Sequence, residues 1–428
     1  MHRNRFFVIA LFLSLLFLLH SRLSAAGFSI LEQSTVGLGR ALAGMTAEID
    51  DPGALYFNPA AGAWHEQRSL MLGGHALLGE VEFHDRGSNR SGRQDKNITS
   101  LALVPNLYYV HPLSDGITLN VGLSATSGTS TKYRGNWPGR YFAHDTEIKV
   151  IELNSSLSWR LNDEWALGAA FIVQYADALM SQAIPFDTVN FNRSLDGQLK
   201  LQGDSYAFGY SLGIIYRPLP GTRVGLGYRS KLSHDLSAKA RLRVPKLIAP
   251  FFGGKTRLTE DASIDLDLPP SINLGIQQEL TEKLTLMFDV AWTKWSDMRE
   301  LKVEFDRPLI PGVTSSSEVM KWQDNWRFAL GGEYKLNEKW VLRSGLAFDR
   351  TPVRSKELRI AKLPDDHRLW LSFGAGYKIR ENLQLDAAFT HLFFHKAQIR
   401  QEDALGSRLH GNYTGYMNIY SMAINYKF

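Results

Sequence analysis

Cysteine is absent from the 428-residue sequence, and the absence excludes disulfide bonds and thiolate-bound metals. A basic cluster is also missing, because 48 Lys and Arg residues are spread among 43 Asp and Glu residues and leave a net charge of +5. We therefore expect no nucleic-acid partner, and we interpret the small positive charge as suited to anionic lipid headgroups. The 12 histidines show no HExxH or HxH spacing, so we expect no metal and no cofactor.

Long apolar runs are missing beyond the start of the chain. Residues 6–19 are continuously apolar, follow Arg3 and Arg5, and precede the small residues at positions 24–26. This order is typical of a secretory signal peptide, here residues 1–25, with cleavage after Ala25 or Ala26. The run is shorter than the ~20 residues that a transmembrane helix needs. An exported chain without a helical span is either soluble or a β-barrel.

Signatures of catalysis are missing as well. The sequence contains no GxSxG nucleophile motif, and Gly37-Leu38-Gly39 has neither the preceding strand nor the βαβ unit of a dinucleotide-binding loop. Asp365, Asp366 and His367 are acid–base residue types, but we interpret them as part of a structural ion-pair network. We therefore expect no catalytic residue and no enzyme activity.

Alternation of large apolar side chains with small or polar ones is the dominant pattern. Tyr206, Phe208 and Tyr210, for example, alternate with Ala207 and Gly209. Successive side chains of a strand point to opposite faces, so such runs predict strands with one apolar face. The strands are long and carry aromatic residues near both ends, as the 10 Trp, 16 Tyr and 23 Phe allow. This pattern favours a transmembrane β-barrel over a soluble β-sandwich.

Short and long connections alternate along the chain and predict fourteen strands. Because both ends of such a barrel lie on its short-turn side, we expect an all-β, antiparallel barrel in the outer membrane of a Gram-negative bacterium. The final strand, ending at Phe428, resembles the signal that the barrel assembly machinery recognises, and we expect a monomer in outer-membrane lipid. The short turns lie near residues 114–116, 162–164, 218–221, 281–283, 337–339 and 380–382, and the long connections span roughly 85–96, 128–144, 182–197, 241–260, 305–317, 351–364 and 399–411.

Residues 26–66 do not follow the strand pattern and are rich in small residues, including Gly37, Gly39 and Gly44. Glycines at this density allow close backbone packing. A barrel of fourteen strands, formed by residues 67–428, leaves a lumen that its own side chains do not fill. We therefore predict that residues 26–66 form a partly helical plug, or hatch, inside the barrel.

Several motifs occur in order along nearly the whole chain. In the predicted plug they are Ala26-Gly27-Phe28, Gly37-Leu38-Gly39-Arg40-Ala41, Asp50-Asp51 and Asn58-Pro59-Ala60. A carboxy-terminal block contains Trp326-Arg327, Gly331, Trp340, Arg343, Gly345, Ala347-Phe348-Asp349, Pro352-Val353, Leu363-Pro364-Asp365-Asp366-His367-Arg368 and Trp370-Leu371-Ser372. Together these motifs resemble the FadL family of long-chain fatty acid and hydrocarbon transporters, and Trp137 with Gly139-Arg140-Tyr141 resembles its hydrocarbon-uptake branch.

The resemblance implies passive uptake of long-chain fatty acids or related lipophilic compounds. Substrate would enter an apolar pocket above the hatch, with Phe28 in its lining, and leave sideways where the third strand kinks. We expect that kink within residues 117–127, at Gly122. Asn58-Pro59-Ala60 would touch the kink and form the gate together with Gly122.

The implied substrate contacts depart from the family pattern. Gln182 and Glu318 occupy the approximate positions where fatty-acid transporters carry basic residues, which favours neutral aromatic or aliphatic hydrocarbons as alternative substrates. Lys321 and Arg327 lie near these positions and are our candidate carboxylate contacts. An outer-membrane lipase-type enzyme and a general porin are further alternatives. Candidates for an outer substrate groove are the apolar loop residues Ile184, Phe186, Leu247, Ile248, Phe251 and Phe252.

Overall fold

The computed structural model describes residues 27–94 and 96–428. The predicted signal peptide, residues 1–25, therefore lies outside the described residues. Within the described part of the chain, no helix is long and apolar enough to cross a membrane.

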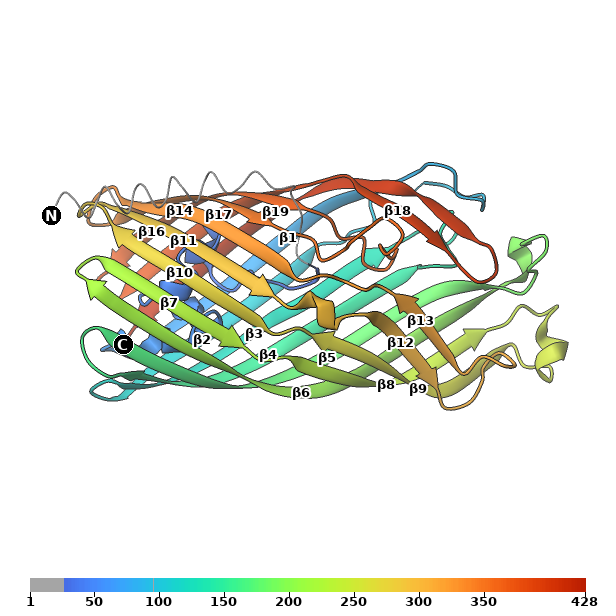
Figure 1. Cartoon of the computed structure of the whole chain (residues 1–428), viewed down its shortest axis with the longest axis horizontal. Coiled ribbons are helices and arrows are strands. Elements are labelled where there is room, and N and C mark those ends of the chain that lie inside the picture. Colours follow the sequence, from blue (N-terminus) through green and yellow to red (C-terminus); the bar gives the residue numbers. More distant parts are fainter. Residues whose placement is uncertain (1–26, 95) are drawn as a thin grey trace.

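The strands form one antiparallel sheet that closes into a barrel, because β1 pairs with β2 on one side and with the last strand, β19, on the other (Figure 1). Closure gives every barrel strand a neighbour on each side over at least part of its length, which removes the two open edges of a flat sheet. The segments are β1 (Ser69–Asp85), β2 (Ala102–Ser114), β3 (Ile117–Lys132), β4 (Asp145–Arg160), β5 (Trp165–Pro185), β6 (Asp196–Leu219), β7 (Thr222–Arg229), β8 (Leu232–Arg243), β9 (Arg257–Leu268), β10 (Ser271–Glu279), β11 (Leu284–Thr293), β12 (Glu300–Phe305), β13 (Ser315–Val319), β14 (Asn325–Lys335), β15 (Trp340–Asp349), β16 (Arg368–Arg380), β17 (Leu383–Phe394), β18 (Ala397–Glu402) and β19 (Arg408–Lys427).

Five of these segments continue a preceding one across a local break. The pairs are β7/β8, β9/β10, β11/β12, β13/β14 and β17/β18, so nineteen segments make fourteen barrel strands. Pro269 and Pro270 separate β9 from β10, because proline has no N–H group for the hydrogen-bond ladder. The short 3-10 helix η6 (Trp295–Asp297) separates β11 from β12. The prediction of a fourteen-stranded antiparallel barrel is confirmed.

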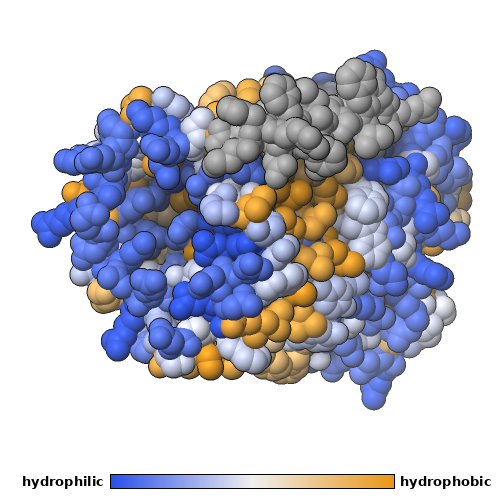
Figure 2. Space-filling model, turned by 60° about the vertical axis from the view of Figure 1, so that its left-hand side comes forward, coloured by the Kyte–Doolittle hydropathy of each residue, from blue (hydrophilic) through white to orange (hydrophobic). Residues whose placement is uncertain are grey.

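An apolar belt surrounds the barrel between two zones of aromatic side chains. At the short-turn end, Trp165 stacks on Tyr216 with ring centroids 4.0 Å apart, and at the other end Tyr175 lies 5.1 Å from Tyr206. The eleven residues from Trp165 to Tyr175 match the 9–11 residues with which a tilted strand crosses a bilayer. Figure 2 shows a stripe of hydrophobic side chains with hydrophilic side chains on either side of it.

The amino-terminal segment, residues 27–66, runs inside the barrel, as the blue ribbon of Figure 1 shows. It contains α2 (Thr35–Leu38), η1 (Met45–Ala47), η2 (Pro52–Tyr56) and η3 (Pro59–Trp64). Side chains of Ser34, Asp51 and Asn58 cap three of these short helices. The helices contact strands around the ring, with η3 against β4, β5 and β6, η1 against β10, and α2 against β16 and β17. We call this segment the plug. Outside it, η4 (Arg193–Leu195) and η5 (Ala249–Phe252) lie in the long loops.

Polar anchors hold the plug to the wall. The fully buried Arg40 guanidinium forms ion pairs of 2.5 Å with Glu48 of the plug and with Glu333 of β14. Inward-facing glycines make room at these points: a Cβ atom on Gly345 would lie 2.2 Å from the Arg40 carbonyl oxygen, and one on Gly225 would lie 1.9 Å from the Thr46 carbonyl oxygen. The wall is therefore shaped to fit the plug backbone closely.

Candidate binding cavity in the barrel wall

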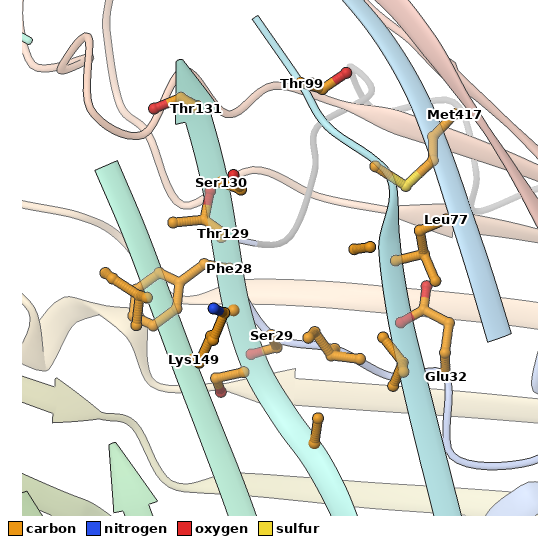
Figure 3. Close-up of a pocket in the computed structure, with 18 of the residues that line it drawn as sticks. Phe28, Ser29, Glu32, Leu77, Thr99, Thr129, Ser130, Thr131, Lys149 and Met417 are labelled. Carbon is orange, nitrogen blue, oxygen red and sulfur yellow. The ribbon is translucent and has the colours of Figure 1, made fainter. Parts of the chain in front are cut away.

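The main cavity has a volume of about 890 Å³ and lies between the start of the plug and strands β1 to β4, with side chains of β17 to β19 completing its lining. Figure 3 shows Phe28 and Ser29 on one side of it, and Leu77 and Met417 on the other. Aliphatic side chains are the most numerous type in the lining, which also includes many hydroxyl groups, such as that of Thr129, and several charged groups, such as that of Lys149. A volume of this size falls within the range of small-molecule sites.

The cavity extends through the barrel wall. Besides interior residues such as Phe28, its lining includes Leu103 and Leu123, which are 72% and 46% exposed on the outer surface of the apolar belt. The strand pairing explains the passage. Pairing of β1 with β2 ends at Leu77 and Ala102, and pairing of β2 with β3 ends at Ser124, so one edge of β3 has no strand neighbour beyond that point.

The plug pairs with this free edge. Ile30 N donates to the Thr126 carbonyl oxygen at 2.9 Å, Gly128 N donates to the Phe28 carbonyl oxygen at 2.9 Å, and Ser29 forms an isolated antiparallel bridge with Ser127. A register shift of β3 against β4 lies at the same place, between Ala125 and Ser127. Residues 28–30 therefore act as a short added strand where the wall is incomplete.

The kink of the third strand is not at Gly122, where we expected it. Gly122 pairs regularly with Tyr108 on β2 and with Asn154 on β4. A Cβ atom at this position would lie 2.7 Å from the Tyr108 ring, so close packing of that ring explains the glycine. The irregularity comes further along the strand, at residues 125–127, and still within the expected range 117–127.

Asn58-Pro59-Ala60 lies away from this irregularity. The Asn58 amide donates to the Thr46 carbonyl oxygen at 2.8 Å and to the Ile214 carbonyl oxygen at 3.0 Å, and the Ser158 hydroxyl donates to the Pro59 carbonyl oxygen at 2.7 Å. These contacts fasten the tripeptide to β4 and β6, nearer the short-turn end. The expected contact with the third-strand kink is therefore wrong, and a gating role for the tripeptide stays a prediction.

Phe28 lies where the plug meets the interior end of the cavity. Its ring contacts Trp295 edge-on at 5.3 Å and Trp322 at 6.3 Å, and the side chain is 4% exposed. Gly27, just before it, is held by hydrogen bonds to two charged side chains. Gly27 N donates to the Asp365 carboxylate at 3.0 Å, and Arg368 donates to the Gly27 carbonyl oxygen at 2.9 Å. Sequence reasoning missed both tryptophans, which lie at breaks of barrel strands.

The rim residues before β16 form the expected ion pairs. Asp365 pairs with Arg368 at 2.8 Å, and Asp366 pairs with Arg359 at 2.9 Å and with His367 at 2.7 Å. Burial of Asp366 opposes its ionisation, but the His367 hydrogen bond and the Arg359 guanidinium hold the pKa of this carboxyl below its usual value. Ligand atoms of Asp366, His367 and His395 lie within 4.8 Å of one another, with Asp366 already bound to Arg359.

The predicted groove residues of the loops divide into two groups. Ile184, Phe186, Ile248 and Phe252 pack against the large apolar cluster of the interior, to which Phe28 also belongs, and the Phe186 and Phe252 rings lie 5.6 Å apart. The structure thus brings these four together at the outer end of an apolar interior. Leu247 and Phe251 do not join them, because they are 73% and 83% exposed at the loop surface.

The two candidate carboxylate contacts do not meet in the cavity. Lys321 is exposed, and Arg327 is buried under the plug, where it donates to the Ala41 carbonyl oxygen at 2.7 Å. Sequence reasoning missed Lys362 instead. Its buried ammonium group donates to Gln182 at 3.0 Å and forms an ion pair with Glu318, so it reaches both of the positions where basic residues were expected.

A profile of the family described as outer membrane protein transport protein (OMPP1/FadL/TodX) matches residues 16–428. The chain is 28% identical to the long-chain fatty acid transport protein of Escherichia coli O6:H1, covering 88% of this chain and 89% of that protein. It is also 28% identical to outer membrane protein P1 of Haemophilus influenzae, covering 95% and 96%.

Solved structures have the same architecture. The crystal structure of a Pseudomonas aeruginosa FadL homologue superposes with a TM-score of 0.85 at 25% identity, covering 94% of this chain and all of that one. The toluene transporter TbuX of Ralstonia pickettii superposes with a TM-score of 0.69 at 18% identity, covering 93% and 100%, and shares the fold. The barrel and these relatives place the protein in the outer membrane of a Gram-negative bacterium. The chain belongs to the OMPP1/FadL/TodX family of outer membrane transport proteins.

Proposed function

We propose that this protein lets hydrophobic compounds diffuse across the outer membrane without an energy source and releases them sideways into the lipid. The observation that supports this best is the cavity, which joins Phe28 in the interior to Leu103 and Leu123 on the lipid-facing surface. Burial of each methylene group gains ~0.8 kcal/mol, so exit into lipid is easier than release into water. The relatives named long-chain fatty acid transport protein and toluene transporter agree with this function.

In this proposal the plug closes the lumen to polar solutes, and its first residues form the moving part. Asn58-Pro59-Ala60 fixes the plug to β4 and β6, which confines movement to the end that carries Phe28. Release of residues 28–30 from the edge of β3 would widen the passage between β1 and β3.

Uptake by a variant whose lipid-facing cavity opening is blocked tests the sideways route. Ala102 lines the cavity where β2 begins, so Ala102→Trp places an indole in the passage. We expect uptake of a labelled long-chain fatty acid by a deletion strain carrying this variant to fall at least about tenfold, the effect of 1.4 kcal/mol on a barrier. Ala169→Trp, on the exposed outer face of β5, is the matched control and should transport normally. Normal uptake through the Ala102 variant would contradict the route.

The second candidate substrate class is neutral hydrocarbons, and the Lys362–Glu318 ion pair favours it. Glu318 already neutralises the cation that would otherwise attract a fatty-acid carboxylate. Apolar side chains such as Leu199, Leu201 and Leu301 line the small pocket beside this pair. The binding affinity of a neutral molecule does not depend on a free cation, whereas a fatty-acid carboxylate must compete with Glu318 for Lys362.

Removal of the Glu318 charge separates the two substrate classes. We expect Glu318→Gln to strengthen binding of oleate by about tenfold, because Lys362 then lacks its carboxylate partner, and to leave binding of an alkane unchanged. Quenching of tryptophan fluorescence, with Trp295 and Trp322 beside Phe28, reports the binding. Glu338→Gln, in an exposed short turn, is the control. Unchanged oleate binding in the Glu318 variant would remove Lys362 from consideration as a carboxylate site.

We further propose that the protein is a monomer without enzymatic activity. The sheet closes through the β1–β19 pair and the free edge of β3 pairs with the plug, so little strand edge is left for a second copy; the lipid-facing opening of the cavity is lined by aliphatic side chains such as Leu103 and Leu123. Strand β19 and the terminal Phe428 would be the part that the barrel assembly machinery recognises during biogenesis. Light scattering in detergent should give a protein mass equal to that of one chain, and a mass of two or more chains would contradict the monomer.

A further inference from the structure

Four cationic side chains lie together on the outward face of three neighbouring strands near the long-loop end. They are Lys200 on β6, Arg241 and Arg243 on β8, and Arg257 on β9, and we call them the outer basic patch. In the sheet register, Arg241 lies directly opposite Lys200, and Arg243 directly opposite Arg257. The three arginines are exposed and Lys200 is half-buried.

Strand alternation fixes the direction in which the patch faces. Leu242 and Ala240, the neighbours of the arginines on β8, are buried in the apolar cluster of the interior. Leu201, beside Lys200 on β6, belongs to the same cluster. Since successive side chains point to opposite faces, the patch faces outward, away from the transport cavity.

The four cations have no carboxylate partner within residues 27–94 and 96–428. Other lysines of this half of the barrel do have one: Lys149 pairs with Glu147, Lys239 with Asp261 and Lys302 with Glu304 on strands, and Lys231, between β7 and β8, pairs with Asp267. Like charges directly opposite each other on neighbouring strands are destabilising. A bound anion would relieve this repulsion. The nearby lysines are neutralised by carboxylates of the same chain, whereas these four cations remain available to an external anion.

The patch lies beyond the acyl chains. Tyr206 and Phe208, which are 65% and 64% exposed, mark the end of the apolar belt on β6. Lys200 lies six residues further along this strand, or about 20 Å at ~3.3 Å per residue. The carboxylates of Asp204 and Asp235 come between the belt and the patch. An anion that binds this patch would therefore lie in the polar layer around the long-loop end of the barrel, which faces the cell exterior.

We propose that the outer basic patch binds the phosphorylated sugar headgroup of a glycolipid in the outer leaflet. Arginine guanidinium groups bind phosphate through paired hydrogen bonds, and three of them within two adjacent strands suit a headgroup that carries several phosphates. The acyl chains of the same lipid would lie along the belt below, against Tyr206 and Phe208. Attachment of this lipid would orient the barrel and stabilise the outer ends of β6, β8 and β9.

Binding of purified lipopolysaccharide to the full-length protein tests this proposal. The protein in detergent micelles is titrated with lipopolysaccharide, with the same glycolipid after enzymatic removal of its phosphates, and with inorganic phosphate alone. We expect the phosphorylated glycolipid to bind at least about tenfold more tightly than the dephosphorylated one, since each cation near an anionic lipid surface contributes on the order of a fivefold change. The difference should shrink as salt rises from about 0.05 to 0.5 M.

Charge reversal identifies the residues responsible. The triple variant Arg241→Glu, Arg243→Glu and Arg257→Glu should lose the preference for phosphate. A matched triple variant at the short-turn end, Lys283→Glu, Lys335→Glu and Lys339→Glu, changes the net charge equally and should keep it. The heat-dependent gel migration of folded barrels checks that both variants fold. The proposal is overturned by equal affinity of the wild type for the two glycolipids, by a preference that survives in the patch variant, or by equally tight binding of inorganic phosphate.

Discussion

Single atoms decide how closely the plug fits the barrel wall. Gly345 and Gly225 face inward where the plug backbone passes, and a methyl group on either would overlap a plug carbonyl oxygen. Sequence alternation places these glycines on strands, but it does not tell which face is crossed by the plug. The role of Lys362 could not be predicted from the sequence for a related reason. Its partners Gln182 and Glu318 are 180 and 44 residues away in the chain, and only the folded loops bring them together.

Substitution of Gly345 should loosen the plug. We expect Gly345→Val to lower the free energy of unfolding by about 3 kcal/mol, the upper range for overpacking, because its Cβ atom would lie 2.2 Å from the Arg40 carbonyl oxygen. Urea titration followed by gel migration measures the change. Gly74→Val is the matched control, since no atom lies within 4 Å of the Cβ position there. Equal stability of the two variants would show that the wall yields to the plug.

Among the elements, β3 carries the structural irregularity on which the proposed route depends. Its alternating pattern is enough to predict a strand, and the range 117–127 was expected to contain a kink. The register shift at residues 125–127 was not predictable, because it depends on where β2 begins and on the pairing of plug residues 28–30 with a free edge. The glycine in this strand did not mark the irregularity, because Gly122 is needed for close packing of the Tyr108 ring.

A disulfide between the plug and β3 should stop transport. The absence of native cysteine makes Ser29→Cys with Ser127→Cys a clean pair, and these residues are bridge partners, a separation that suits a disulfide. We expect fatty-acid uptake to fall to background when the pair is oxidised and to recover on reduction, if residues 28–30 must leave the edge of β3.

The control for this lock is a disulfide that spans two strands elsewhere. Ser237 and Ser263 are register partners on the outer face of β8 and β9, so Ser237→Cys with Ser263→Cys cross-links the wall without touching the plug. Its uptake should be the same in both redox states. Full transport by the oxidised Ser29–Ser127 pair would mean that substrate passes without movement of the plug end.

At the scale of the whole molecule, the sequence predicted the architecture well, because strand number, turn order and the lumen all follow from local patterns. Tyr206, Phe208 and Tyr210 face the lipid as their alternation indicates, and β16 begins at Arg368, the last residue of the motif Leu363-Pro364-Asp365-Asp366-His367-Arg368. The cavity could not be predicted in this way. Its lining comes from the plug, from β1 to β4 and β16 to β19, and from distant loops, and its opening depends on the early end of the β1–β2 and β2–β3 pairing.

Deletion of residues 27–62 tests the plug as a seal. We expect the deleted barrel to become permeable to small polar solutes, because a fourteen-stranded ring is too wide for its own side chains to close. Swelling of liposomes in sugar solutions measures the leak, and gel migration confirms that the shortened chain forms a barrel. Liposomes with the intact protein serve as the control. A folded deletion variant that stays impermeable would mean that something other than the plug seals the lumen.

The closing seam between β1 and β19 also sets a sequence of events during biogenesis. The plug contacts β4, β5 and β6 through η3, and β16, β17 and β19 through α2, so its partners lie on both sides of the seam. The full set of plug contacts therefore exists only once the first and last strands have met. From then on the wall surrounds the plug, which can leave only along the barrel axis after breaking buried contacts such as the Arg40–Glu333 ion pair. The mature protein should owe its persistence to this kinetic barrier as much as to its equilibrium stability.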